Sequence, residues 1–186
     1  MQISEEDRKI LQNYSNKPDE DNVRYKKIIK EKLLKNNRII YLLHDEELEK
    51  ANSKNDDYFG VCILPYYLIA PVQHEVRHYI CYECSFNRES LYNSIIKAQT
   101  IIFYVLVEQK DILINQDGIS AARHDLLTAE IINEFNGCND FGNQLKLISC
   151  KPSTTDTNYA TYTIVFEQLT PNSITKYGEK SFNLRK

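Results

Sequence analysis

Two histidines and a glutamate, closely spaced, are the residues of this chain best suited to metal chemistry. His74, Glu75 and His78 stand in the order H-E-x-x-H. On a helix, the first and fifth residues of this pattern share a face, so both imidazoles reach one Zn²⁺ while the carboxylate activates a metal-bound water. The spacing names a zinc-dependent hydrolase as a candidate function, with His74 and His78 as ligands and Glu75 as general base.

The neighbouring sequence weighs against a working zinc site. The five residues resemble the motif of zinc peptidases, but Arg77 is charged where that family has uncharged residues, and no H-x-x-G-x-x-H continuation follows. From Ile80 to Phe86, every second residue would share one face of an extended chain, which predicts a strand. If that strand reached back to Val76 or earlier, the histidines would lie about 13 Å apart instead of about 6 Å, too far to share an ion. Since Val72, Val76 and Ile80 also fit a helix, we expect no metal and keep the zinc hydrolase as the alternative function.

A second pattern suits a metal-dependent nuclease. Glu108 and Lys110 follow an apolar strand, as the E-x-K half of a nuclease core does. Such a core also needs an upstream acid near the same metal, for which Asp56, Asp57 and Glu89 are available without a distinctive setting. Charged residues at the end of a strand are usually solvated. The nuclease is therefore the third functional hypothesis.

The cysteines do not form a recognisable metal or redox site. Cys81 and Cys84 form a lone C-x-x-C, and on the predicted strand they point to opposite faces, which prevents both chelation and pairing. The chain has five cysteines, and its first residues are acidic without the apolar region of a signal peptide. We therefore expect reduced thiols in a protein that is made in the cytoplasm.

Composition limits the class of protein further. The 186 residues, 42% of them hydrophobic, suit one domain with a core. With 23 basic and 26 acidic side chains, the net charge is −3, which gives no strongly basic surface for duplex nucleic acid. The longest apolar run, Ile101–Val107, is the length of a strand and too short to span a bilayer. We expect no association with membranes.

The periodicity of the sequence predicts the order of its helices and strands. We expect a polar arm over residues 1–20, a single domain over 21–170 that includes an extended arm at 52–75, and a tail over 171–186. Helices are predicted at Glu5–Tyr14, Asp21–Asn36, from Asn87 through Ala98, and at Ser120–Phe135; strands are predicted at Arg38–Leu43, Val61–Ala70, Tyr79–Phe86, Ile101–Val107, Gln144–Cys150 and Tyr159–Leu169. A turn or loop, with one helical turn, is expected over Asp45–Asp57.

The helix at Ser120–Phe135 is the most strongly patterned. Ser120 is a suitable N-cap, and Asn136-Gly137 is a suitable end. Its inner face is expected to carry Ala122, Leu126, Ala129 and Phe135, widened by Leu127, Ile131 and Ile132. Together the elements predict an α+β fold, with a mainly antiparallel sheet of about four to six strands and two to three helices packed on one face.

The order of the predicted elements and the character of their sequences resemble those of a group of phage proteins. They are similar to the small α+β neck proteins of tailed bacteriophages, the tail terminators and head–tail connectors. The similarity rests on the stretches YICYECSF, IIFYVLVEQKD, ISAARHDLLTAEIINEFN, QLKLISCKPS and YTIVFEQLTPNS, within residues 79–172, and on the first long helix.

The resemblance implies a structural role in the virion, with assembly in the host cytoplasm. Copies would form a homo-oligomeric ring that contacts other neck or tail proteins and lets DNA pass without specific binding. It implies no catalytic residues and no cofactor. Residues 52–75, 151–158 and 171–186 would be the arms that reach neighbours, and Tyr66, Tyr67 and Tyr177 are the aromatic side chains expected to anchor them.

Overall fold

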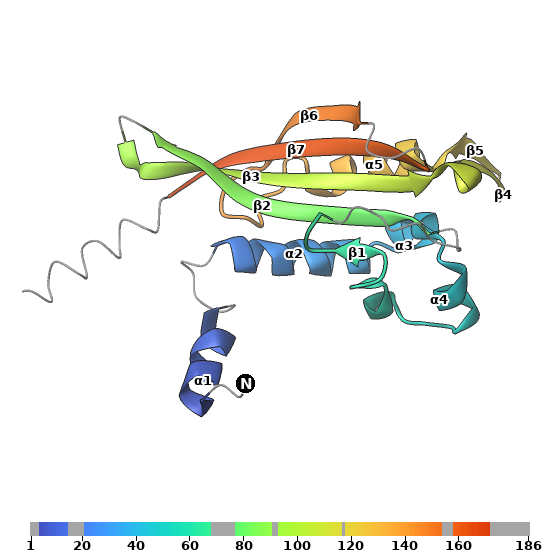
Figure 1. Ribbon diagram of the computed structural model, residues 1–186. Helices are drawn as coiled ribbons and strands as arrows, with labels where there is room; N and C mark the ends of the chain where they lie inside the picture. Colours follow the sequence, from blue (N-terminus) through green and yellow to red (C-terminus); the bar gives the residue numbers. More distant parts are fainter. Residues whose placement is uncertain are drawn as a thin grey trace, which may run out of the picture.

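A long, twisted sheet with helices against one face forms the body of the protein (Figure 1). The computed structural model describes residues 4–14, 21–67, 77–90, 93–116, 118–153 and 158–171. Its helices are α1 (Glu5–Tyr14), α2 (Asp21–Lys35), α3 (Asn37–Leu43), α4 (Glu46–Lys50) and α5 (Arg123–Phe135), with 3-10 turns η1 (Asn55–Tyr58) and η2 (Gln109–Asp111). Its strands are β1 (Ile63–Leu64), β2 (Tyr79–Ser90), β3 (Asn93–Glu108), β4 (Leu113–Gln116), β5 (Ile119–Ala122), β6 (Lys146–Ser153) and β7 (Tyr159–Pro171).

The main sheet has the strand order β1-β2-β3-β7-β6. Only the short β1–β2 pair is parallel; β2–β3, β3–β7 and β6–β7 are antiparallel. β4 and β5 form a separate hairpin. The expected α+β class with a mainly antiparallel sheet is thus confirmed. No helix among the described residues is both long and apolar enough to cross a membrane.

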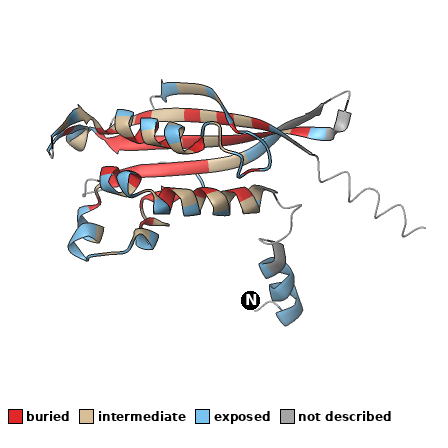
Figure 2. Cartoon of the chain, turned by 180° about the vertical axis from the view of Figure 1, so that it is seen from behind, coloured by how far each residue is buried: buried red, intermediate tan, exposed pale blue. Residues whose placement is uncertain are grey.

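The core lies between the sheet and the layer made by α2, α3 and α5. Figure 2 shows the buried residues of the strands and helices facing each other across this layer. Phe103 on β3 occupies its centre, with ring centroids 4.8 Å from Phe135 of α5, 5.8 Å from Phe166 of β7 and 6.2 Å from Tyr82 of β2. The strand predicted at Ile101–Val107 is therefore the central, buried one.

A smaller apolar cluster lies on the opposite face of the sheet, at the end of β2 where the chain enters. Its buried members are Leu64, Tyr79, Cys81, Leu106 and Tyr159. We call this second group the outer cluster. Successive residues of β2 point alternately to the two faces: Ile80 and Tyr82 belong to the core, and Tyr79 and Cys81 to the outer cluster. The helices therefore cover one face, and the segment after β1 contributes to the other.

The predicted strand at Arg38–Leu43 is wrong, because these residues form α3. Asn36 caps the helix, since its side-chain oxygen accepts hydrogen bonds from the backbone N–H groups of Arg38 and Ile39. Ile39, Leu42 and Leu43 are buried at the spacing of one helical face. A segment of six mostly apolar residues fits the period of a helix as well as that of a strand, and the Asn36 cap favours the helix.

The predicted helix from Asn87 through Ala98 is also wrong. Asn87 pairs with Ala98 and Phe86 with Gln99, so β2 and β3 continue as one long hairpin. Pairing with the central strand outweighs the weak helical preference of this segment. The register of the hairpin shifts between Asn87 and Glu89 and again between Glu89 and Ser90.

The helix predicted at Ser120–Phe135 begins later and faces differently than expected. Residues 119–122 form β5, with Ser120 donating to the side chain of Asn115, and α5 starts at Arg123. Its buried apolar face is Leu127, Ile131 and Phe135. Leu126 and Ala129, expected inside, lie outside this face, and the predicted end at Asn136-Gly137 is confirmed, with Gly137 at φ +83°.

Of the strand predicted at Val61–Ala70, the structure assigns Ile63–Leu64, and residues 68–70 lie outside the described part. The helical turns expected over Asp45–Asp57 are present as α4 and η1. The two C-terminal strands are confirmed as β6 and β7.

Replacing Phe103 with Ala tests the position of the core. The ring is fully buried among three other rings, so its loss should lower the free energy of unfolding by about 3–5 kcal/mol. Phe86→Ala on the neighbouring strand is the matched control, because Phe86 is 46% exposed and should contribute far less. Urea unfolding followed by circular dichroism measures both; equal losses would contradict the packing described.

Candidate functional site

The described part of the H-E-x-x-H motif enters β2 as extended chain. Arg77 and His78 precede the strand without helical structure, whereas His74 and Glu75 lie outside the described residues. His78 is fully buried. Its Nδ1 accepts a hydrogen bond from the backbone N–H of Glu108 at 3.2 Å, and its Nε2 lies 3.2 Å from a carboxylate oxygen of Asp111. Both ring nitrogens therefore have protein partners.

These contacts define the charge of His78. Burial, with a smaller effect of the nearby Arg123, lowers the pKa of His78 to about 4, against the opposing effect of the Asp111 hydrogen bond. The ring is thus neutral at physiological pH. Because Nδ1 accepts from a backbone N–H, the proton sits on Nε2 and is donated to Asp111. To bind a metal, His78 would have to release one of these partners.

Asp111 is held in turn by a buried arginine at the start of α5. Arg123 lies 2.8 Å from the Asp111 carboxylate, and its Nε donates to the Asp111 carbonyl at 3.0 Å. Its Nη1 donates to the carbonyl of Leu42, the buried end of α3, at 3.0 Å. One guanidinium therefore ties α5, η2 and α3 together, and we call His78, Asp111 and Arg123 the buried triad.

Arg77, which departs from the zinc-peptidase pattern, has a structural role beside the triad. Its Nε donates to the Asp45 carboxylate at 2.6 Å and its Nη2 to Glu47 at 2.7 Å. Asp45 is itself buried, caps α4 by accepting from the Leu48 N–H at 3.0 Å, and accepts from the Cys62 thiol. Burial opposes the charge of Asp45, but these hydrogen bonds outweigh it, and its pKa is lowered.

The residues proposed for a nuclease are only partly brought together. Lys110 Nζ lies 3.5 Å from Glu108 Oε1, and the other Glu108 oxygen accepts from the Arg77 N–H at 3.3 Å. Asp57 instead accepts from the backbone of Lys54 in η1. In the part of the chain that the structure describes, no group of three or more His, Cys, Asp or Glu side chains is arranged to hold a metal ion.

The C-x-x-C pair is separated as expected. Cys81 belongs to the outer cluster, and Cys84 packs against the core on the other face of the sheet. Burial raises the pKa of Cys84 to about 12, so this thiol stays protonated and is a poor nucleophile.

The aromatic anchors predicted from the sequence differ in environment. Tyr66 is exposed, whereas Tyr67 is half-buried with its ring 4.5 Å from that of Tyr104 on β3. Tyr67 therefore holds the segment after β1 onto its own sheet. Tyr177 lies outside the described residues.

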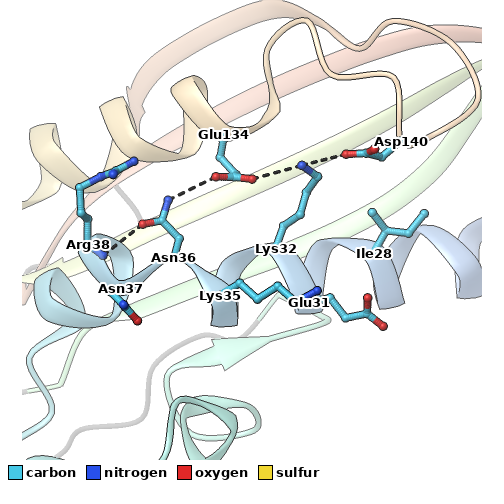
Figure 3. A pocket seen from close by; sticks show the side chains of 9 residues that line it. All are labelled: Ile28, Glu31, Lys32, Lys35, Asn36, Asn37, Arg38, Glu134 and Asp140. Atoms are coloured by element: carbon cyan, nitrogen blue, oxygen red, sulfur yellow. Dashed lines mark hydrogen bonds and ion pairs between the residues drawn. The ribbon is translucent and has the colours of Figure 1, made fainter.

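A charged cleft of about 800 Å³ lies between α2 and α5 (Figure 3). Lys32 spans it, 3.1 Å from Glu134 and 2.8 Å from Asp140, and Asn36 donates to the second Glu134 oxygen at 3.3 Å. Arg38 at its end pairs with Glu130 at 2.7 Å. The cations are matched by carboxylates of the same cleft, so the arrangement joins two helices rather than offering a positive field to a phosphate.

An apolar groove of about 380 Å³ lies on the other side of Arg38, between α3, α5 and β5. Its apolar lining is Tyr41, Leu42, Ile119, Leu126 and Ala129, with Asn37, Arg38 and Glu130 at the rim. Sequence reasoning placed Leu126 and Ala129 in the core and so missed this groove. The sequence signal for the groove was the breadth of the apolar stripe on α5, because packing against one sheet does not cover a stripe of this width.

The pH dependence of stability tests the buried triad. Unfolded His78 takes up a proton near pH 6.5 and folded His78 only near pH 4, so the unfolded state gains as pH falls. The group should remove about 2 kcal/mol of stability between pH 7 and pH 5. In His78→Gln this slope should disappear, whereas His44→Gln should retain it. Urea unfolding at several pH values measures the slopes, and an unchanged slope in His78→Gln would contradict the assignment.

Comparison with known proteins identifies the family of the chain. No curated protein matches the chain. The YomW family model matches residues 36–168, which include α3, the buried triad, the apolar groove, strands β1, β2, β3 and β6, and β7 up to Gln168. This family is phage-derived, in agreement with the phage origin expected from the element order, and its description assigns no place in the neck or tail. The chain belongs to the YomW family of phage-derived proteins.

Proposed function

We propose that the chain is a structural protein of the phage particle, which assembles into a ring at the head–tail joint or at the end of the tail. The family supplies the phage context. The observation that carries the proposal is the far end of the sheet, where β2, β3 and β7 extend beyond the helix layer (Figure 1). A sheet end that no helix of the described residues covers leaves surface for neighbouring copies.

Apolar side chains are exposed toward this end of the sheet, on β7 and on the edge strand β6, which pairs with the middle of β7. Leu169 of β7 and Ile148 of β6 are each 58% exposed, and both line a depression of about 420 Å³. Ala98 pairs with Leu169 across the β3–β7 ladder, on the face opposite that of Gln99 and the core residue Ile101. Large exposed side chains gathered on an otherwise uncovered sheet face are typical of protein interfaces.

The edges of the sheet favour the same function. Among the described residues, β6 pairs on one side only, with β7, and β1 covers only Ile80 and Cys81 of β2. Open edges present backbone N–H and C=O groups that a strand or arm of another copy can pair with. A surface on one side that fits a different surface on the next copy closes into a ring when the rotation allows it.

The two enzyme hypotheses receive less support. A zinc hydrolase would use a histidine whose ring nitrogens already contact Glu108 and Asp111. A nuclease would use Glu108, which is buried and contacts Arg77 and Lys110. These contacts hold the end of the sheet together, and assembly requires such rigidity.

Replacing the exposed apolar side chains of this surface with charged ones tests the proposal. The double variant Ile148→Glu/Leu169→Glu should lower the oligomer mass, because it places two charges in the proposed interface. Leu113→Glu is the matched control: Leu113 is equally well exposed but lies in the separate β4–β5 hairpin. Mass photometry measures the particle mass, and circular dichroism checks the fold. A wild-type chain that stays strictly monomeric, alone and with other proteins of the phage particle, would overturn the proposal.

A further inference from the structure

Ile10 and Leu11 leave an apolar face of α1 exposed in the part of the chain that the structure describes. Ile10 is 44% and Leu11 57% exposed, whereas the opposite face carries the Glu5–Lys9 ion pair of 3.6 Å. Ser4 begins the helix by accepting from the Asp7 N–H at 3.0 Å. A ten-residue helix is marginal in water on its own and is normally stabilised by burying its apolar face. α1 therefore has the surface of a docking helix.

The same chain offers a groove that matches this face. The apolar groove between α3 and α5 has a volume of about 380 Å³ and exposes the ring of Tyr41 beside Leu126 and Ala129. A groove lined by two helices and a strand can receive an amphipathic helix through its apolar face. Ile10 and Leu11 are adjacent in sequence and about 100° apart around the helix, so together they form one broad apolar side of α1. The exposed apolar face of α1 and the open apolar groove could therefore bury each other.

Charge favours one orientation of α1 in the groove. The first turn of α1 carries Glu5, Glu6 and Asp7. At the rim of the groove, Arg38 pairs with Glu130 at 2.7 Å. Exposed Lys35, at the end of α2, lines the adjoining cleft together with Asn37 and Arg38. Placing the acidic turn beside Lys35 gives complementary charges next to an apolar centre, which favours one register of the helix.

The length of the connection points to a second copy as the source of the helix. Six residues, 15–20, join α1 to α2, and they span at most about 21 Å. The groove lies past the far end of α2, which at 15 residues is itself about 22 Å long. Figure 1 shows α3 at the end of α2 away from this connection. A chain's own α1 would have to run back with its connection fully stretched, whereas a neighbour's α1 has no such constraint.

We propose that α1 of one copy docks in the α3–α5 groove of a second copy, with Ile10 and Leu11 packed against Tyr41, Leu126 and Ala129. The proposal rests on the assembly function in that it adds a contact between copies of the ring. It uses a surface separate from Ile148 and Leu169. The contact is heterologous, because helix and groove are different surfaces, and so it can repeat around a ring.

Cross-linking between variants that each add one cysteine to the five native ones tests the contact directly. Chains carrying Leu11→Cys are mixed with chains carrying Ala129→Cys, oxidised, and separated on a non-reducing gel. The expected result is a covalent dimer of one chain of each kind, identified by mass spectrometry of the joined peptides. Lys9→Cys replaces Leu11→Cys in the control mixture, because Lys9 lies on the opposite face of α1; it should give a much weaker band.

A double variant carrying both cysteines distinguishes the source of the helix. A cross-link that forms only within one chain, with none in the mixture, would show that α1 covers its own groove and would overturn the proposal. Absence of the cross-link in both samples would overturn it as well. The test is distinct from that of assembly: rings without the cross-link remove only the helix contact, whereas a strict monomer removes both.

The strength of the contact is tested with Leu11→Ala. Loss of this side chain from an apolar groove should weaken association between copies roughly tenfold. Gln12→Ala, on the far side of α1, is the control and should leave association unchanged. Concentration-dependent mass photometry gives both values, and equal association of Leu11→Ala and the wild-type chain would contradict the placement of Leu11.

Discussion

The contact between Arg123 and Asp111 is the interaction on which the arrangement of this protein depends. Arg123 begins α5, Asp111 ends the turn after β3, and the same guanidinium donates to the carbonyl of Leu42 near the end of α3. A buried charge is tolerated only where it is paired and fully hydrogen-bonded, so these elements have little freedom to shift. The apolar groove, whose walls are α3 and α5, inherits its shape from this contact.

Much of the fold is visible in the sequence because its signals are local. The run from Ile101 to Val107 indicates a buried strand, and the helix ending at Asn136-Gly137 carries its own stop. The errors occur where local patterns are ambiguous. Residues 38–43 fit both periods, and residues 87–98 become strand because they extend a ladder that the central strand already provides. Non-local pairing decided the second case, and no local pattern contains it.

The polar site was less predictable, because its partners are distant in the chain. Arg77 looked like a defect in an enzyme motif, yet its partner Asp45 stands 32 residues earlier. His78 contacts Asp111 at a separation of 33 residues. Ion pairs of this kind have no periodicity, and Asp, Glu and Arg are common enough that many pairings are conceivable. What the sequence did indicate correctly is that the cysteines of the C-x-x-C face opposite sides of the sheet.

The strand order has a consequence for when the sheet end is complete during synthesis. The central strand β3 lies between β2, its neighbour in sequence, and β7, the last strand described. The β2–β3 hairpin can form early, but Phe103 keeps an open side until Phe166 arrives. Because Leu169 stands on that same last strand, the sheet end cannot exist on a half-made chain. For the sheet-end contact proposed above, the order of synthesis would therefore act as a checkpoint, since only chains finished at least through β7 present that surface.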